Sequence, residues 1–68
     1  MNKYNEGVVF ARAQTDVRAG DIVRTTKTGV VFDRRPTAKN PCNPESLVCV
    51  CSARAGGLCE YVVNGLLP

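Results

Sequence analysis

The chain has 68 residues, with 9 Lys and Arg against 6 Asp and Glu, no His and no Trp, giving a formal net charge of +3. This length allows one domain with a small core, which usually needs a disulfide, a metal or neighbouring subunits for stability. The missing His removes the commonest general base and metal ligand, so we expect no enzyme, no catalytic residue and no cofactor. No segment is long and apolar enough to span a membrane, and we expect no membrane partner.

The first seven residues are polar and mixed in charge. They lack the pattern of a secretory signal peptide, so we expect synthesis in a cytosol, where thiols stay reduced. We interpret residues 1–7 as an extended N-terminal arm and residues 8–68 as a single domain. Seven extended residues span about 23 Å, which is enough to reach a neighbouring subunit.

Five short runs rich in Val, Ile, Phe and Tyr predict strands, and no window has the periodicity of a helix. The runs are residues 8–11, 21–26, 30–32, 47–51 and 59–63. Short β-branched runs separated by Gly-containing turns are typical of small β-barrels and sandwiches. The sequence therefore predicts an all-β fold, a small β-barrel or sandwich of short strands.

Residues 33–46 differ from the rest of the chain because they contain three of its four prolines. Proline donates no backbone hydrogen bond, so this segment cannot be an inner strand. We predict a Pro-rich loop. A loop this long in a small domain is often functional, and a plain solvated connection is the alternative.

Two segments of the chain resemble each other at an offset of 36 residues: RAGD at 18–21 and RAGG at 54–57. The same offset relates TG at 28–29 to NG at 64–65. We interpret both units as a turn, a strand and a second turn, with chance recurrence of a short turn motif as the alternative. Glycine permits the positive φ that such turns require. The predicted turn glycines are Gly20, Gly29, Gly56 and Gly65.

The four cysteines, Cys42, Cys49, Cys51 and Cys59, do not have the spacing of a zinc site, which uses pairs separated by two to four intervening residues. Cys49 and Cys51 are expected on one face of a strand, about 6–7 Å apart, which suits neither a metal nor a mutual disulfide. We expect no metal. Buried free thiols that pack as small hydrophobes are the first interpretation, and Cys59, at the position equivalent to Val23, fits it. A disulfide framework of unspecified connectivity is the second.

Three motifs, with a basic Pro-rich loop before the last, together resemble a known family. They are RAGDIV at 18–23, TGVV at 28–31 and LVCVCSARAGGLCEYVVNGLL at 47–67. This order resembles the small head-decoration, or capsid cement, proteins of tailed phages, in which Ala53, Ala55 and Gly56 would match a characteristic turn and residues 59–67 a closing hairpin. The chain departs from the family pattern at Cys49, where Gly is common, and in its longer, more Pro-rich 33–46 loop.

The resemblance implies a β-barrel without an active site on the outer surface of a phage head, made in the host cytoplasm. Such proteins bridge neighbouring major capsid proteins, often as trimers. The arm would add a strand to the capsid, and the basic loop would meet acidic capsid patches. The residues expected to bind are Lys3, Tyr4, Asn5, Arg34, Arg35 and Lys39. For the two arginines, an ordinary solubilising charge is the alternative.

Two other functions stay open. A small nucleic-acid-binding barrel is favoured by the eight Lys and Arg against four acids in residues 1–40, and by Tyr4, Phe10 and Phe32 as stacking faces. However, the basic residues are spread out, and we expect Phe10 and Phe32 in the core, since aromatics are scarce. A secreted, disulfide-stapled module is the other alternative.

Overall fold

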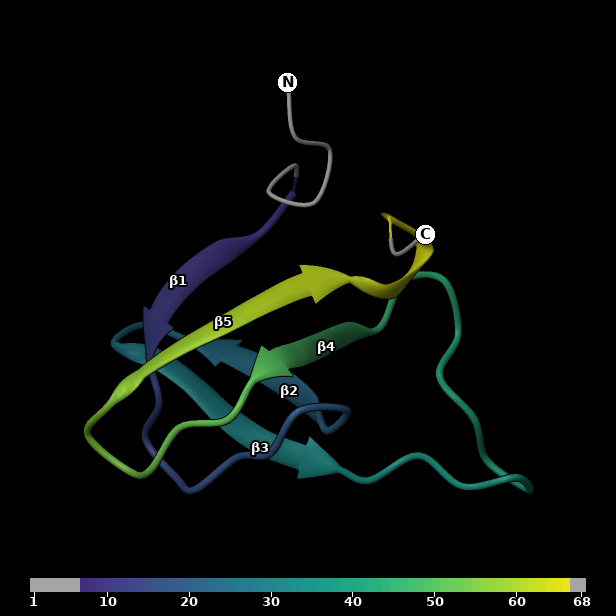
Figure 1. The fold of residues 1–68 in the computed structure, drawn as a ribbon, viewed down its shortest axis with the longest axis horizontal. Helices are drawn as coiled ribbons and strands as arrows, with labels where there is room; N and C mark the ends of the chain where they lie inside the picture. Colours follow the sequence, from purple (N-terminus) through teal and green to yellow (C-terminus); the bar gives the residue numbers. More distant parts are fainter. Residues whose placement is uncertain (1–6, 67–68) are drawn as a thin grey trace.

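The fold is all-β, as the sequence predicts, in a computed structural model that describes residues 7–66. The strands are β1 (Val9–Arg12), β2 (Ile22–Thr26), β3 (Gly29–Arg34), β4 (Leu47–Cys51) and β5 (Leu58–Val63), followed by a short 3-10 helix, η2 (Asn64–Leu66) (Figure 1). Each strand begins within one residue of a predicted run. The β-branched runs therefore located the strands correctly.

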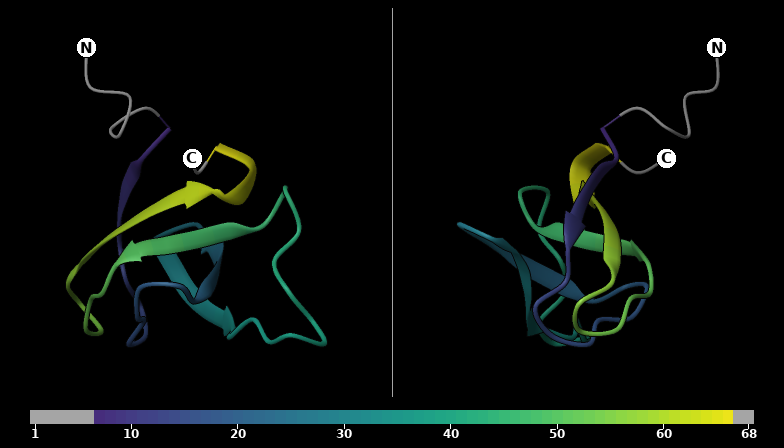
Figure 2. Two further views of the ribbon diagram at one scale, coloured as in Figure 1. Left: turned by 45° about the vertical axis from the view of Figure 1, so that its right-hand side comes forward. Right: turned by 90° about the vertical axis from the view of Figure 1, so that its left-hand side faces the viewer.

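All five strands form one antiparallel sheet in the order β1-β5-β4-β2-β3. The sheet curls, so that the chain just after β1 meets β3 at the other end of this order (Figure 2). Gln14 N–H donates to the Val30 carbonyl oxygen (2.8 Å), and Phe32 N–H donates to Thr15 Oγ1 (2.8 Å). These bonds bring the two ends of the sheet together as a small, partly closed barrel.

The offset of 36 residues reappears in the strand pairing. The register of β2 with β4 is the same as the register of β5 with β1. Adding 36 to the numbers of the paired residues of β2 gives residues of β5, and subtracting 36 from those of β4 gives residues of β1. The matching pairs are Ile22–Val48 with Leu58–Arg12, and Val23–Leu47 with Cys59–Ala11. Val17 and Ala53, also 36 apart, exchange two backbone hydrogen bonds of 2.9 and 3.0 Å. The two halves are therefore related by a pseudo-two-fold axis that passes near this bridge.

The two Ala-Gly turns obey the same relation. The 18–21 turn closes with Asp21 N–H donating to the Arg18 carbonyl (2.9 Å), and the 54–57 turn closes in the same way (2.8 Å). Gly20 and Gly56 have φ of +96° and +89°, the left-handed region that favours glycine. A Cβ at either position would meet nothing within 4 Å, so backbone strain alone requires glycine there.

The barrel interior is filled by small side chains. Its fully or nearly fully buried members are Ala13, Val17, Val23, Val30, Cys49 and Cys59. A second buried row, Ile22, Val48 and Val62, runs across β2, β4 and β5 outside this cluster. Cys59 and Val23, equivalent under the offset, are both buried, which confirms the packing role predicted for Cys59.

Phe10 and Phe32 are not in the core, and this prediction was wrong. Their side chains are 59% and 39% exposed. On β1 the positions directed inward are taken by Ala11 and the following Ala13, and side chains alternate along a strand, so Phe10 is directed outward. Phe32 lies on β3, the last strand in the sheet order.

Cys51 also departs from its predicted place beside Cys49 on one strand face. Cys49 pairs with Tyr61, but Cys51 pairs with the adjacent Glu60, because the register shifts between the two cysteines. The shift turns Cys51 to the opposite face, where it is exposed, while Cys49 stays buried. The closing hairpin expected at residues 59–67 is not formed in its described part, because β5 is followed directly by the 3-10 helix η2 and not by a turn and a second strand.

Candidate functional site

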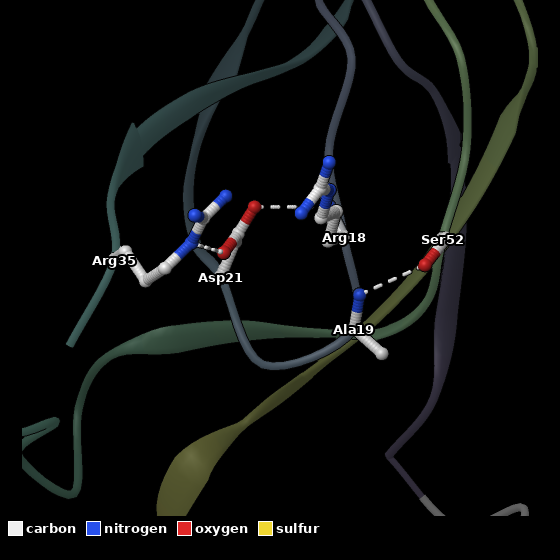
Figure 3. Close-up of polar contacts among 5 residues, drawn as sticks. All are labelled: Arg18, Ala19, Asp21, Arg35 and Ser52. Atoms are coloured by element: carbon white, nitrogen blue, oxygen red, sulfur yellow. Dashed lines mark hydrogen bonds and ion pairs between the residues drawn. The ribbon is translucent and has the colours of Figure 1, made fainter.

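Among the described residues, Asp21 is the one charged residue that is buried, with 2% of its surface exposed. It ends the 18–21 turn, where Oδ2 accepts a hydrogen bond from the Arg18 backbone N–H (2.9 Å) and Oδ1 accepts one from Arg35 Nε (3.0 Å) (Figure 3). Burial by itself raises the pKa of Asp21, but these hydrogen bonds and the positive charge of Arg35 outweigh it and hold the pKa below 3.8. Asp21 therefore stays ionised at neutral pH and fastens the start of the 33–46 loop to the turn.

This attachment is one departure from the pseudo-two-fold symmetry; another is β3, which lies between β1 and β2, whereas their equivalents β4 and β5 pair directly. Other side-chain contacts of the two turns are matched: Ser52 Oγ accepts from the Ala19 N–H (3.0 Å; Figure 3), and Asp16 Oδ1 accepts from the Ala55 N–H (2.8 Å). Both residues of the second contact are shifted by 36 from those of the first. The position equivalent to Asp21 is Gly57, which has no side chain to hold a loop. The contact between Asp21 and Arg35 therefore has no counterpart at the second turn.

Arg34 shapes the loop from its first end: it is the last residue of β3, which takes up residues 33 and 34 of the predicted loop. Its guanidinium donates to the carbonyl oxygens of Asn40 (2.6 Å) and Pro41 (3.0 Å). Thr37 and Asn40 exchange two backbone hydrogen bonds of 3.2 Å, which close a tight turn around Ala38 and Lys39. Lys39 is exposed at the tip of this turn, so the loop presents a positive charge on an ordered support.

The second half of the loop is tied to the end of β5. The Asn64 N–H donates to the Ser46 carbonyl (2.7 Å), and Asn64 Nδ2 donates to the Asn43 carbonyl (3.1 Å). The Gly65 N–H donates to the Pro44 carbonyl (3.0 Å). The loop leaves the sheet at the end of β3 and returns to β4, and both ends are held by hydrogen bonds (Figure 1). It is an ordered protrusion.

A second surface lies on the outward face of β1 and β5. Phe10 is paired directly across from Glu60, and Arg12 from Leu58, so the four side chains share one face. We call these four residues the β1–β5 patch. Phe10 is 59% exposed and Leu58 is 65% exposed. The patch therefore combines two exposed apolar side chains with one charge of each sign.

The structure places the predicted binding residues in three different situations. Lys3, Tyr4 and Asn5 lie outside the described residues. Arg34 and Arg35 are both engaged within the chain, as given above, and Lys39 is exposed at the loop tip. Sequence reasoning missed the β1–β5 patch, although the alternation of Phe10 and Arg12 with three smaller residues in VFARA contained the signal for it.

The described residues offer little chemistry of other kinds. Residues 7–66 contain no group of three or more His, Cys, Asp or Glu side chains placed to hold a metal ion. A shallow hollow beside β2 is lined by Arg24, Asp33 and Glu45 among others, and it is widely open. In the part of the chain that the structure describes, no helix is long and apolar enough to cross a membrane.

Comparison with known proteins gives no relative: no family model, no curated protein and no solved structure matches the chain.

Proposed function

We propose that the protein is a structural virion protein, a capsid decoration or cement protein that binds the outer surface of a phage head and bridges neighbouring major capsid proteins. The observation that carries the proposal is the β1–β5 patch. Half of it lies on β1, an outer strand of the sheet in residues 7–66, and the chain enters this strand directly from the predicted arm. Arm and patch together would form one continuous contact surface.

In this proposal the arm adds a strand to a capsid protein, and the patch supplies the apolar contact. Full burial of a Phe or Leu side chain contributes about 1.5–3 kcal/mol, so Phe10 and Leu58 are the main anchors. Each protein that touches two capsid subunits also gains from the high effective concentration of its second contact. Assembly as a trimer on the head would increase this gain.

The 33–46 loop has a secondary role in the proposed binding to the capsid. Lys39 meets acidic groups of the capsid, and Arg34 and Arg35 act mainly by holding the loop in shape. An ordered loop loses less conformational entropy on binding than a flexible one, which favours its use as a contact. Binding to a lattice also stabilises a domain of this size, because the capsid binds the folded form only.

The test is co-sedimentation of the purified protein with undecorated heads of the phage that encodes it, over a range of salt concentrations. We expect saturable binding, weakened at least tenfold by Phe10→Ser or Leu58→Ser. Phe32→Ser is the matched control, because it removes an exposed aromatic on β3, outside the β1–β5 patch, and it should bind like the wild type. Absence of binding at every salt concentration would contradict the proposal.

Nucleic-acid binding is the second candidate, and one observation favours it. Phe10 and Phe32 are exposed, and exposed aromatic rings can stack on bases. This function predicts retention of single-stranded nucleic acid on filters with a steep salt dependence, and loss of binding in both Phe10→Ser and Phe32→Ser. The capsid proposal predicts no such retention, so the pair of variants separates the two functions.

A further inference from the structure

Two of the four thiols are in contact inside the barrel. The Sγ atoms of Cys49 on β4 and Cys59 on β5 are 3.4 Å apart, and the two residues are 1% and 0% exposed. The other two differ: Cys51 is exposed and Cys42 is half-buried. Only the Cys49–Cys59 pair therefore combines contact with exclusion from solvent.

The same core is filled without sulfur at the two positions that the offset relates to these cysteines. The residues 36 positions away from Cys49 and Cys59 are Ala13 and Val23, and both are buried in the same core. The fold therefore fills one half with Ala and Val and the other half with two thiols that touch. A bonded sulfur pair is about 2.05 Å long, so the thiols must approach by about 1.4 Å to be joined.

We propose that Cys49 and Cys59 are a site of oxidative modification, where a low-molecular-weight disulfide such as oxidised glutathione creates an intramolecular disulfide across β4 and β5. This inference does not depend on the proposed capsid function. The thiolate of one cysteine attacks a sulfur of the oxidant, forms a mixed disulfide and releases one glutathione. The second cysteine then attacks the protein sulfur of the mixed disulfide and releases the other glutathione. Two protein thiols lose their protons and are oxidised, and one oxidant disulfide is reduced to two thiols.

Burial controls the rate of this reaction. Burial, and then the hydrogen bond with Cys49, raises the pKa of Cys59 to about 12. The thiolate is the attacking species, so the native protein reacts slowly at neutral pH and faster as the pH rises. The bond therefore forms mainly during folding or when β4 and β5 separate transiently, and a low concentration of urea should accelerate it.

The bond can be assigned by tryptic digestion. Cleavage after Lys39 and Arg54 puts Cys49 in the peptide 40–54 and Cys59 in the peptide 55–68. The protein is incubated with oxidised glutathione at pH 8 in about 1–2 M urea. Free thiols are alkylated before digestion. We expect the two peptides to be joined by a bond that dithiothreitol breaks, with Cys42 and Cys51 alkylated. The variant Cys42→Ser with Cys51→Ser should give the same linked pair.

Persistent alkylation of both Cys49 and Cys59 after prolonged oxidation would overturn the proposal, and so would a glutathione adduct that never resolves into the linked peptides. Fragment ions of the wild-type peptides locate the bond even if the double variant does not fold. A link through Cys42 or Cys51 instead of Cys49 in the wild-type protein would also refute it.

A stability measurement gives an independent control. The bond would close a loop from residue 49 to residue 59, and we expect the oxidised protein to melt on the order of 10 °C above the reduced protein. Cys49→Ala and Cys59→Val carry the side chains that the fold already buries at positions 13 and 23. These variants should fold, should not crosslink, and should show no change in melting temperature on oxidation. An equal melting temperature for oxidised and reduced wild-type protein would contradict the proposed crosslink.

Discussion

Replacing Asp21 with Asn tests whether the buried carboxylate holds the loop to the barrel. The carboxylate accepts from the Arg18 N–H with one oxygen and from Arg35 Nε with the other. An amide has a single oxygen, so one of these donors would face an NH2 group. The Arg35 side chain is 60% exposed and can turn to water, so the remaining oxygen would keep the Arg18 bond.

The cost then comes from burying an amide NH2 without a partner at a position that is 2% exposed. Such a group costs about 1–3 kcal/mol, and we expect Asp21→Asn to lower the free energy of unfolding by about 2 kcal/mol. Small domains unfold with a urea dependence of about 1 kcal/mol per molar, so the midpoint should fall by about 2 M. Circular dichroism during urea unfolding measures this shift.

Asp33→Asn is the matched control, because it removes the same charge at an exposed position of β3. It should change the free energy of unfolding by less than about 0.5 kcal/mol. Arg35→Gln should fall between the two, because the Arg18 bond to Asp21 survives and the lost partner is exposed. If Asp21→Asn is no more destabilising than Asp33→Asn, the carboxylate does not have the anchoring role described above.

Three further predictions concern other parts of the structure. The pKa of Asp21 is lower in the folded than in the unfolded chain. Its contribution to stability is therefore complete above about pH 4 and is lost as the pH falls through the lower folded value. Acid unfolding followed by circular dichroism should show that Asp21→Asn removes this part of the pH dependence. Gly20→Ala should cost about 1–2 kcal/mol through backbone strain alone, whereas Gly29→Ala should cost more because its Cβ would overlap the Arg12 carbonyl oxygen; urea unfolding that gives equal losses would refute this difference. In the native, reduced protein at pH 8, iodoacetamide should modify Cys51 well before Cys59, and mass spectrometry that finds equal rates would contradict the burial of Cys59.

The strands were predictable because their evidence is local. Runs such as residues 47–51 and 59–63 are β-branched and end at turn residues, and each became a strand at nearly the predicted place. The offset of 36 between the two Ala-Gly turns was also visible in the sequence. Its structural meaning, a shared register of β2–β4 and β5–β1 pairing, needed the three-dimensional arrangement.

The features that were missed depend on contacts between distant segments. Arg35 meets Asp21 only because the start of the loop passes the 18–21 turn, and no local pattern pairs the two residues. Cys51 turns outward because of a one-residue register shift against β5, which composition does not reveal. The scarcity of aromatics predicts Phe10 in the core, whereas the small side chains of the two halves already fill the barrel. The arm residues of the predicted binding site lie outside the described residues.

The central claim is that this protein is a part of a phage particle, and its stoichiometry in purified virions tests that claim most directly. Quantitative mass spectrometry of gradient-purified particles should find the protein at a constant, high copy number relative to the major capsid protein, and urea or salt that strips the head surface should release it. Particles that contain the full complement of major capsid protein and none of this protein would contradict the claim.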